Sequence, residues 1–131
     1  MDIGFTVHSR WLDQGVDVSR TVYDALRAER ERTAAQIAAL TVDFDGMVAA
    51  AESSDTDDEH DPEGATIAFE RAQVMAVLEH SHSRLAKIDH ALERLAAHSY
   101  GTCEWCGQQI APERLVARPS ATTCITCAAR R

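Results

Sequence analysis

The sequence predicts an all-α fold: a long antiparallel helical hairpin, formed as a coiled coil with an acidic tip, followed by a small C-terminal module that contains four cysteines. Two long stretches carry apolar residues at alternating spacings of three and four, which is the pattern of a coiled-coil seam. Near the C-terminus, the four cysteines form two C-x-x-C pairs, which is typical of a metal-binding module. A chain of 131 residues has room for one such hairpin and one small module.

The first helix is expected over residues 19–53, with Ser19 as its N-cap. Seven seam positions follow one another at spacings of 4, 3, 4, 3, 4 and 3: Leu26, Arg30, Thr33, Ile37, Leu40, Phe44 and Met47. Arg30 and Thr33 are weak points of the seam, because neither side chain is apolar. The alanines between these positions favour helix, whereas Gly46 weakens it.

The second helix is expected to begin at Pro62 or Ala65 and to end at Ala97. Proline suits the first turn of a helix, and Asp61 would then be the N-cap. The seam repeats the same spacings: Val74, Leu78, Ser81, Leu85, Ile88, Leu92 and Leu95. Ile67 extends it by one heptad. Helices of nearly equal length joined by a short polar loop bury their seams best as an antiparallel pair.

These elements divide the chain into three parts. Residues 1–18 show no sustained periodicity and are expected to form an N-terminal extension. Residues 19–98 are expected to form the coiled-coil hairpin, with a tip loop at 54–64, and residues 99–131 the cysteine-rich module. Because a two-helix hairpin has a thin core, a metal ion bound at its base is expected to stabilise the whole chain.

The charge distribution argues against several classes of function. The net charge is −8, so nucleic acid, which is bound by basic surfaces, is not the expected partner. Seven acidic residues, without which the net charge would be −1, gather in one place: Glu52, Asp55, Asp57, Asp58, Glu59, Asp61 and Glu63. No run of about 18 apolar residues is present, so no membrane span is expected. No catalytic constellation is present either, and we expect no enzyme.

Cys103, Cys106, Cys124 and Cys127 are the candidate metal ligands. Seventeen residues separate the two pairs, which falls within the window of a structural zinc site, and four thiolates close a tetrahedron around Zn²⁺. Gly107 permits the sharp turn after the first pair. The alternatives are two disulfides, which a cytoplasmic chain without a signal-peptide pattern disfavours, and a redox C-x-x-C, which normally stands alone beside a βαβ unit. We therefore expect one structural zinc ion, held in a small C-terminal zinc finger.

The residues around these cysteines resemble the DksA/TraR family of C4-type zinc-finger proteins. The matching residues are the run Tyr100-Gly101-Thr102-Cys103-Glu104-Trp105-Cys106-Gly107, then Ile110, Arg114-Leu115, Ala117-Arg118-Pro119 and Cys124-Ile125-x-Cys127. Together they are much more specific than C-x-x-C alone. The long hairpin before the finger is also the family's arrangement, so the resemblance covers about residues 19–131 and is dense over 85–127.

The resemblance implies a bacterial, cytoplasmic and monomeric transcription regulator that binds RNA polymerase directly and does not touch DNA. In the family, the coiled coil enters the secondary channel of the polymerase, and acidic residues at the tip approach the catalytic centre. A zinc-stabilised coiled-coil adaptor for another protein is the alternative, and a small zinc protein that binds nucleic acid is a more distant one.

The family's tip motif, Asp-x-x-Asp-x-Ala, is matched only in part. Counted back from the first cysteine, Glu63 and Ala65 fall on its second half, with Glu in place of Asp. The first Asp falls on His60, which Glu59 and Asp61 flank. The resemblance therefore implies that Glu59, Asp61, Glu63 and Ala65 approach the polymerase active centre. The alternative is that the acidic loop is a solvated linker without a specific function.

The family's contacts with the alarmone ppGpp also carry over in part. Lys87 on the second helix and Arg118 in the finger match two of them, whereas Ala128 stands where a further lysine is expected. The sequence also ends at Arg131, without the helix that follows the finger in longer members, so strong coupling to ppGpp is not expected. Arginines surround the finger, and one or two of them are expected to offset the charge of a zinc–thiolate centre: Arg114, Arg118, Arg130 and Arg131.

Overall fold

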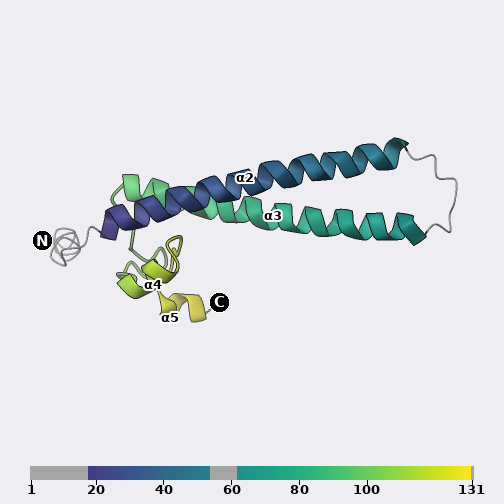
Figure 1. Cartoon of the computed structure of the whole chain (residues 1–131). Helices are drawn as coiled ribbons and strands as arrows, with labels where there is room; N and C mark the ends of the chain where they lie inside the picture. The colour runs from purple at the N-terminus through teal and green to yellow at the C-terminus, as the bar shows by residue number, and fades with distance from the viewer. Residues whose placement is uncertain (1–17, 54–61, 131) are drawn as a thin grey trace, which may run out of the picture. The chain divides into compact units, whose positions relative to one another are not determined.

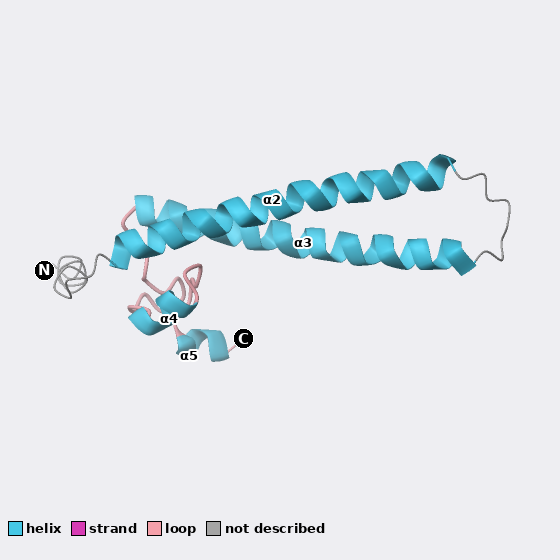
Figure 2. Ribbon diagram, in the orientation of Figure 1, coloured by secondary structure: helices cyan, strands magenta, loops and turns pink. Residues whose placement is uncertain are grey.

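The computed structural model describes residues 18–53 and 62–130, and these residues are almost entirely helix and loop (Figures 1 and 2). The long helices are α2 (Val18–Ser53) and α3 (Pro62–Ala96), and the short ones are α4 (Pro112–Ala117) and α5 (Ile125–Ala129). Within the described ranges, an isolated bridge between Thr102 and Gln109 is the extent of β-structure. The prediction of an all-α fold is confirmed, while the N-terminal extension and most of the tip loop lie outside the described residues.

The chain separates into two compact units, and both long helices run from one into the other. We call the first the finger unit, which comprises described residues 18–30 and 87–130. The second is the helical unit, residues 31–86. In each unit, α2 and α3 lie side by side and antiparallel, as their seams predict (Figure 1).

In the finger unit, the start of α2 packs against the end of α3. The core there consists of apolar residues from both helices: Val22, Leu26, Ile88 and Ala91, with Leu92, Leu95 and Tyr100 packed against it. Arg30, a weak point of the predicted seam, donates from Nε to Asp89 Oδ1 on α3 at 2.6 Å. A polar residue is tolerated at this seam position because its side chain is partly exposed and paired across the helices.

The helical unit has a thinner core. Its most buried residues are Thr33 (4% exposed) and Ser81 (3%), two small hydroxyl residues at seam positions of the two helices. The apolar seam residues are only half-buried, and the Arg71 guanidinium lies 5.8 Å from the centre of the Phe44 ring. Ile67 is 44% exposed, so the predicted extension of the seam by one heptad is wrong. Two helices cannot cover each other's sides completely, and apolar residues outside the seam therefore remain exposed.

The ends of α3 follow from local chemistry. Pro62 is its first residue, as predicted, because the missing N–H of proline costs nothing in the first turn. At the other end, His98 adopts a left-handed conformation with φ of 58°. The His98 N–H donates to the Leu95 carbonyl and the Ser99 N–H to the Arg94 carbonyl, which is the Schellman pattern of helix termination. The chain therefore turns sharply after α3 into the cysteine-rich segment.

Helix α2 is apolar enough to qualify, by length and composition, as a membrane span: the stretch Ser19–Glu52 contains a window of mean hydropathy 1.2. This differs from the expectation that no such stretch exists. The apolar stretch contains Asp43 and Asp45, and each aspartate at the centre of a bilayer costs about 3 kcal/mol. Leu40 and Phe44 of the same stretch are half-buried seam residues, although none of the residues in the apolar window is fully buried.

Candidate metal centre

The first cysteine pair lies in a tight knuckle that follows α3. The Cys103 N–H donates to the Gln108 carbonyl at 2.8 Å, and the Gly107 N–H donates to the Cys103 carbonyl at 3.0 Å. Gly107 has φ of 72°, a left-handed conformation that residues with a Cβ rarely adopt. The role predicted for Gly107 is thus confirmed, and the turn that it permits holds the two cysteines close together.

The second cysteine pair lies at the start of α5. Cys124 is the N-cap of this helix, and its Sγ accepts a hydrogen bond from the Cys127 N–H at 3.4 Å. The Glu104 N–H donates to the Thr122 carbonyl at 2.9 Å, which joins the backbone of the first knuckle to the segment before the second. A backbone hydrogen bond therefore links the segments that carry the two pairs.

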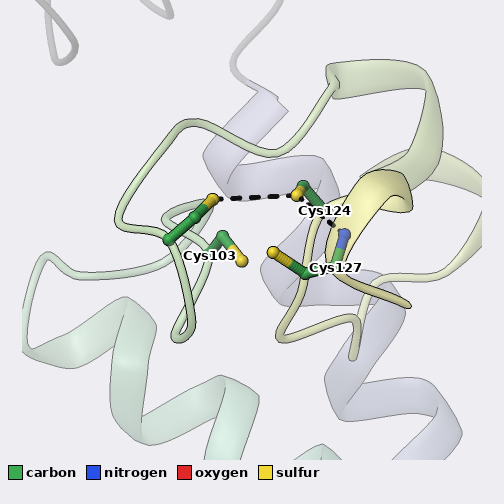
Figure 3. A group of neighbouring side chains, drawn as sticks. Cys103, Cys124 and Cys127 are labelled. Atoms are coloured by element: carbon green, nitrogen blue, oxygen red, sulfur yellow. Dashed lines mark hydrogen bonds between the residues drawn. The ribbon is translucent and has the colours of Figure 1, made fainter. Parts of the chain in front are cut away.

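The four sulfur atoms converge on one point. The Sγ atoms all lie within 4.8 Å of one another, and those of Cys106 and Cys124 are 3.8 Å apart. Figure 3 shows the sulfurs of Cys103, Cys124 and Cys127 directed toward a common centre. A tetrahedron with Zn–S bonds of about 2.3 Å has sulfur–sulfur edges of about 3.8 Å. The donor set therefore fits tetrahedral Zn²⁺, and the cysteines are free thiols, not disulfides.

The surroundings of the thiols differ from one cysteine to the next. Backbone hydrogen bonds, with Cys106 as the main donor, lower the pKa of the Cys103 thiol to about 6. The backbone N–H of Cys127 likewise lowers the pKa of Cys124. The neighbouring Cys124 thiol and burial raise the pKa of Cys127 to about 12. Zn²⁺ binds thiolates, so metal binding at this centre releases the protons that the thiols carry.

A second hydrophobic core supports the cysteines. It consists of Cys103, Ile110, Leu115 and Cys127, of which Ile110 and Leu115 are fully buried. Tyr100 packs against this core and also against the helical core of the finger unit. The Tyr100 ring therefore joins the core of the finger to the core formed by the start of α2 and the end of α3.

The Tyr100 hydroxyl is fixed at the edge of the finger. It donates to the Pro119 carbonyl at 2.6 Å. Burial raises the pKa of Tyr100 to about 12, although the nearby Arg94 lowers it in part. The phenol therefore remains neutral and acts as a hydrogen-bond donor at physiological pH.

Arg94 is a residue of the site that the sequence patterns did not identify. Its side chain, 10% exposed, donates from an amino group to the carbonyls of Ser99 (2.9 Å) and Thr102, and lies 3.5 Å from Glu104. The same Glu104 carboxylate is 2.5 Å from His90 Nε2. The signal in the sequence that could have identified Arg94 is its position in the last turn of a helix that leads directly into a cysteine knuckle.

The fold supports a comparison with known structures over most of the chain. It is similar to the structure of transcription factor DksA2 from Pseudomonas aeruginosa, with a TM-score of 0.72 and 30% sequence identity over 87% of this chain and 82% of that one. This chain belongs to the DksA/TraR family. The family model of the prokaryotic DksA/TraR C4-type zinc finger also matches residues 98–131. The four cysteines accordingly form one structural zinc site, as predicted.

Sequence relatives match over shorter parts of the chain. The uncharacterized protein YteA of Bacillus subtilis (strain 168) is 39% identical over 66 residues, which is 50% of this chain and 28% of YteA. The RNA polymerase-binding transcription factor DksA of Escherichia coli (strain K12) is 42% identical over 43 residues, which is 33% of this chain and 28% of that protein. The chain thus spans less than a third of the length of these two relatives.

The remaining predicted site residues are dispersed along the chain. Glu59 and Asp61 lie outside the described residues, and Glu63 lies in the first turn of α3. Ala65, further along α3, is exposed. Lys87 and Arg118 are both exposed residues of the finger unit, on α3 and at the C-cap of α4. The structure therefore brings together the four cysteines, whereas Ala65, Lys87 and Arg118 are exposed to solvent.

Proposed function

We propose that this protein is a bacterial transcription regulator that binds RNA polymerase through the secondary channel and acts without contacting DNA. The observation that carries the proposal is the likeness to transcription factor DksA2 over 87% of the chain, which includes both the long helices and the finger. DksA of Escherichia coli, which matches over 43 residues of this chain, is named as an RNA polymerase-binding transcription factor. In this proposal the protein is cytoplasmic, monomeric and without enzyme activity.

The acidic segment, by which we mean residues 52–65, is the part of the protein that we propose acts on the polymerase. Glu59, Asp61, Glu63 and Ala65 would approach the active centre of the polymerase, where Mg²⁺ prefers hard oxygen ligands. A carboxylate near that ion changes its field or its water ligands. Seven acids without an intervening lysine or arginine also favour entry into a channel lined by basic residues.

The first experiment measures binding of the zinc-loaded full chain to core RNA polymerase, in competition with Escherichia coli DksA. Mutual displacement is the expected result, because both proteins would occupy the secondary channel. Binding without displacement would contradict the channel mechanism. No binding at micromolar concentration would overturn the proposed function and leave the protein as an adaptor for another partner.

A second experiment separates binding from effect at the tip. The triple variant Glu59→Gln, Asp61→Asn, Glu63→Gln removes the proposed effector carboxylates, and Glu70→Gln removes one exposed carboxylate from α3 as the control. We expect the triple variant to bind polymerase and to lose its effect on open-complex lifetime, while the control retains both. A triple variant with an unchanged effect would show that the acidic segment is a solvated linker.

The proposal for ppGpp is narrower. Lys87 and Arg118 match two family contacts, whereas Ala128 replaces a third. We therefore expect ppGpp to change the promoter effect only slightly, and the double variant Lys87→Ala, Arg118→Ala to remove that change. A strong ppGpp response that survives the double variant would contradict the assignment of both residues.

A further inference from the structure

The two cysteine pairs of the zinc site are held by arginine side chains in matching ways. Arg94 donates to the carbonyl of Thr102, the residue directly before Cys103. Arg114 donates from Nε to the carbonyl of Thr123, the residue directly before Cys124, at 3.0 Å. Each knuckle therefore has a guanidinium bonded to the peptide group that leads into its first cysteine.

We infer that Arg94 and Arg114 are the positioning residues of the zinc site, one for each knuckle. Each fixes the backbone that presents a pair of thiolates, and together they place two positive charges beside the centre. This inference concerns the metal site alone, so it does not depend on the proposed interaction with polymerase.

The contacts of Arg94 show why arginine is needed in the first knuckle. Its guanidinium reaches the carbonyls of Ser99 and Thr102 and the carboxylate of Glu104, which come before and after Cys103 in the chain. A buried cation is stable only when it is paired and its N–H groups have acceptors. The planar fork of arginine serves several acceptors at once, which the single ammonium group of lysine does not reproduce.

The charge of the metal centre gives a second reason. Four thiolates and one Zn²⁺ carry a formal charge of −2, and two of the four cysteines, Cys103 and Cys127, are buried. A buried negative centre is stabilised by nearby positive charge and by oriented donors. Arg94 and Arg114 carry positive charge and are both anchored by hydrogen bonds to the ligand-bearing backbone, although Arg94 also pairs with Glu104.

The two arginines differ in what they join to the knuckles. Arg94 belongs to the last turn of α3, one turn after Ala91, which lies in the core between α2 and α3 of the finger unit. Arg114 belongs to α4, next to Leu115 of the finger core. Loss of Arg94 should therefore weaken the attachment of the finger to the helices as well as zinc binding, whereas loss of Arg114 should affect the finger alone.

The test is zinc affinity of the full chain, measured by competition with a chromogenic chelator, together with the absorption spectrum of the Co²⁺-substituted protein. The variants are Arg94→Gln, Arg94→Lys and Arg114→Gln. Arg130→Gln is the matched control, because it removes the same charge from an exposed position three residues after Cys127. Circular dichroism at saturating zinc reports whether each variant folds.

We expect Arg94→Gln and Arg114→Gln each to lower zinc affinity by about 10- to 100-fold, which is typical when the residues that orient metal ligands are lost. Arg130→Gln should stay within about twofold of wild type by the same standard. Arg94→Lys should lose affinity too, because it keeps the charge without the fork. If Arg94→Gln fails to fold, the zinc affinity of Arg114→Gln alone tests the inference.

Three results would overturn the inference. One is wild-type zinc affinity in both glutamine variants. Another is a loss no greater than that of Arg130→Gln, which would indicate a general effect of charge. The third is full zinc affinity in Arg94→Lys, which would show that a positive charge suffices without the hydrogen bonds that the guanidinium makes to the Ser99 and Thr102 carbonyls. A Co²⁺ spectrum altered in the glutamine variants alone supports positioning of the thiolates.

Discussion

Tyr100 shows how one residue connects the two cores of the finger unit. Its ring packs against both, and its hydroxyl donates to the Pro119 carbonyl. Burial raises the pKa of this phenol from its ordinary value of 10.0 to about 12, because the phenolate would lose its hydration. The raised pKa makes the stability of the fold depend on pH in the alkaline range.

The first prediction concerns Tyr100→Phe in the zinc-loaded protein. At neutral pH, the variant should lose about 1 kcal/mol of unfolding free energy with the hydrogen bond to Pro119. Because the folded pKa lies above the unfolded one, the wild type keeps the stability from this group below pH 10.0 and loses it as pH rises toward about 12. Urea unfolding across this range should therefore show a shallower decline for Tyr100→Phe.

Tyr23→Phe is the control, since it makes the same chemical change at a side chain that is 42% exposed. If Tyr100→Phe and wild type decline with the same slope above pH 10, the alkaline loss has another origin. Because zinc–thiolate centres also respond to pH, the zinc content of each sample must be measured alongside the unfolding curve.

Residues of the site differ in how far the sequence predicts them. The cysteine ligands follow from spacing alone, because each C-x-x-C supplies two thiolates from one turn. Arg94 does not, since its contacts with Ser99 and Thr102 exist only after the chain reverses at His98. A residue other than glycine that adopts a left-handed conformation cannot be recognised from the sequence. Neither the turn at His98 nor the contacts of Arg94 that depend on it were therefore predicted.

At the scale of elements, the sequence predicted both long helices to within three residues, and α3 begins at Pro62, inside the predicted tip loop 54–64. The heptad pattern also predicted the buried positions of Thr33 and Ser81, which are polar residues identified only by their spacing. The pattern was wrong at Ile67, because a period shows which face is apolar and not how far a partner helix covers it. The short helices α4 and α5 were not predicted, since neither is long enough to show a period.

The second prediction compares two glycines in different elements. Gly46 lies within α2, and a Cβ built there meets nothing within 4 Å. Gly46→Ala should therefore raise the unfolding free energy by about 0.5–1 kcal/mol, because alanine loses less backbone entropy in a helix. Gly107 is equally open but has φ of 72°, and Gly107→Ala should lower stability by about 1–2 kcal/mol.

Urea unfolding of the two zinc-loaded variants measures both effects, and the opposite signs serve as mutual controls. Stabilisation by Gly107→Ala would contradict the conformation of the first knuckle. Destabilisation by Gly46→Ala would show that the helix needs a hinge or a close contact at this position, which its open surroundings do not suggest.

At the scale of the whole molecule, the zinc site and the paired helices are joined within the finger unit by two kinds of contact. Tyr100 belongs to the surroundings of both cores, and Arg94 extends from α3 to the backbone before Cys103. A structural metal contributes its binding free energy to the folding of the elements packed around it. Zinc should therefore stabilise the ends of both long helices as well as the finger.

The last prediction follows from the division into two units. Removal of zinc with a chelator should accelerate amide hydrogen exchange over residues 99–130 and, to a smaller extent, over the helix segments 18–30 and 87–96 that belong to the same unit. Residues 31–53 and 64–86 should exchange at nearly the same rate with and without zinc, because their contacts lie within the helical unit. This narrows the expectation from the sequence that zinc stabilises the whole chain. Readdition of Zn²⁺ should restore protection. Faster exchange confined to 99–130 would show that the two cores of the finger unit are independent, and that neither Tyr100 nor Arg94 transmits stability from the metal to the helices.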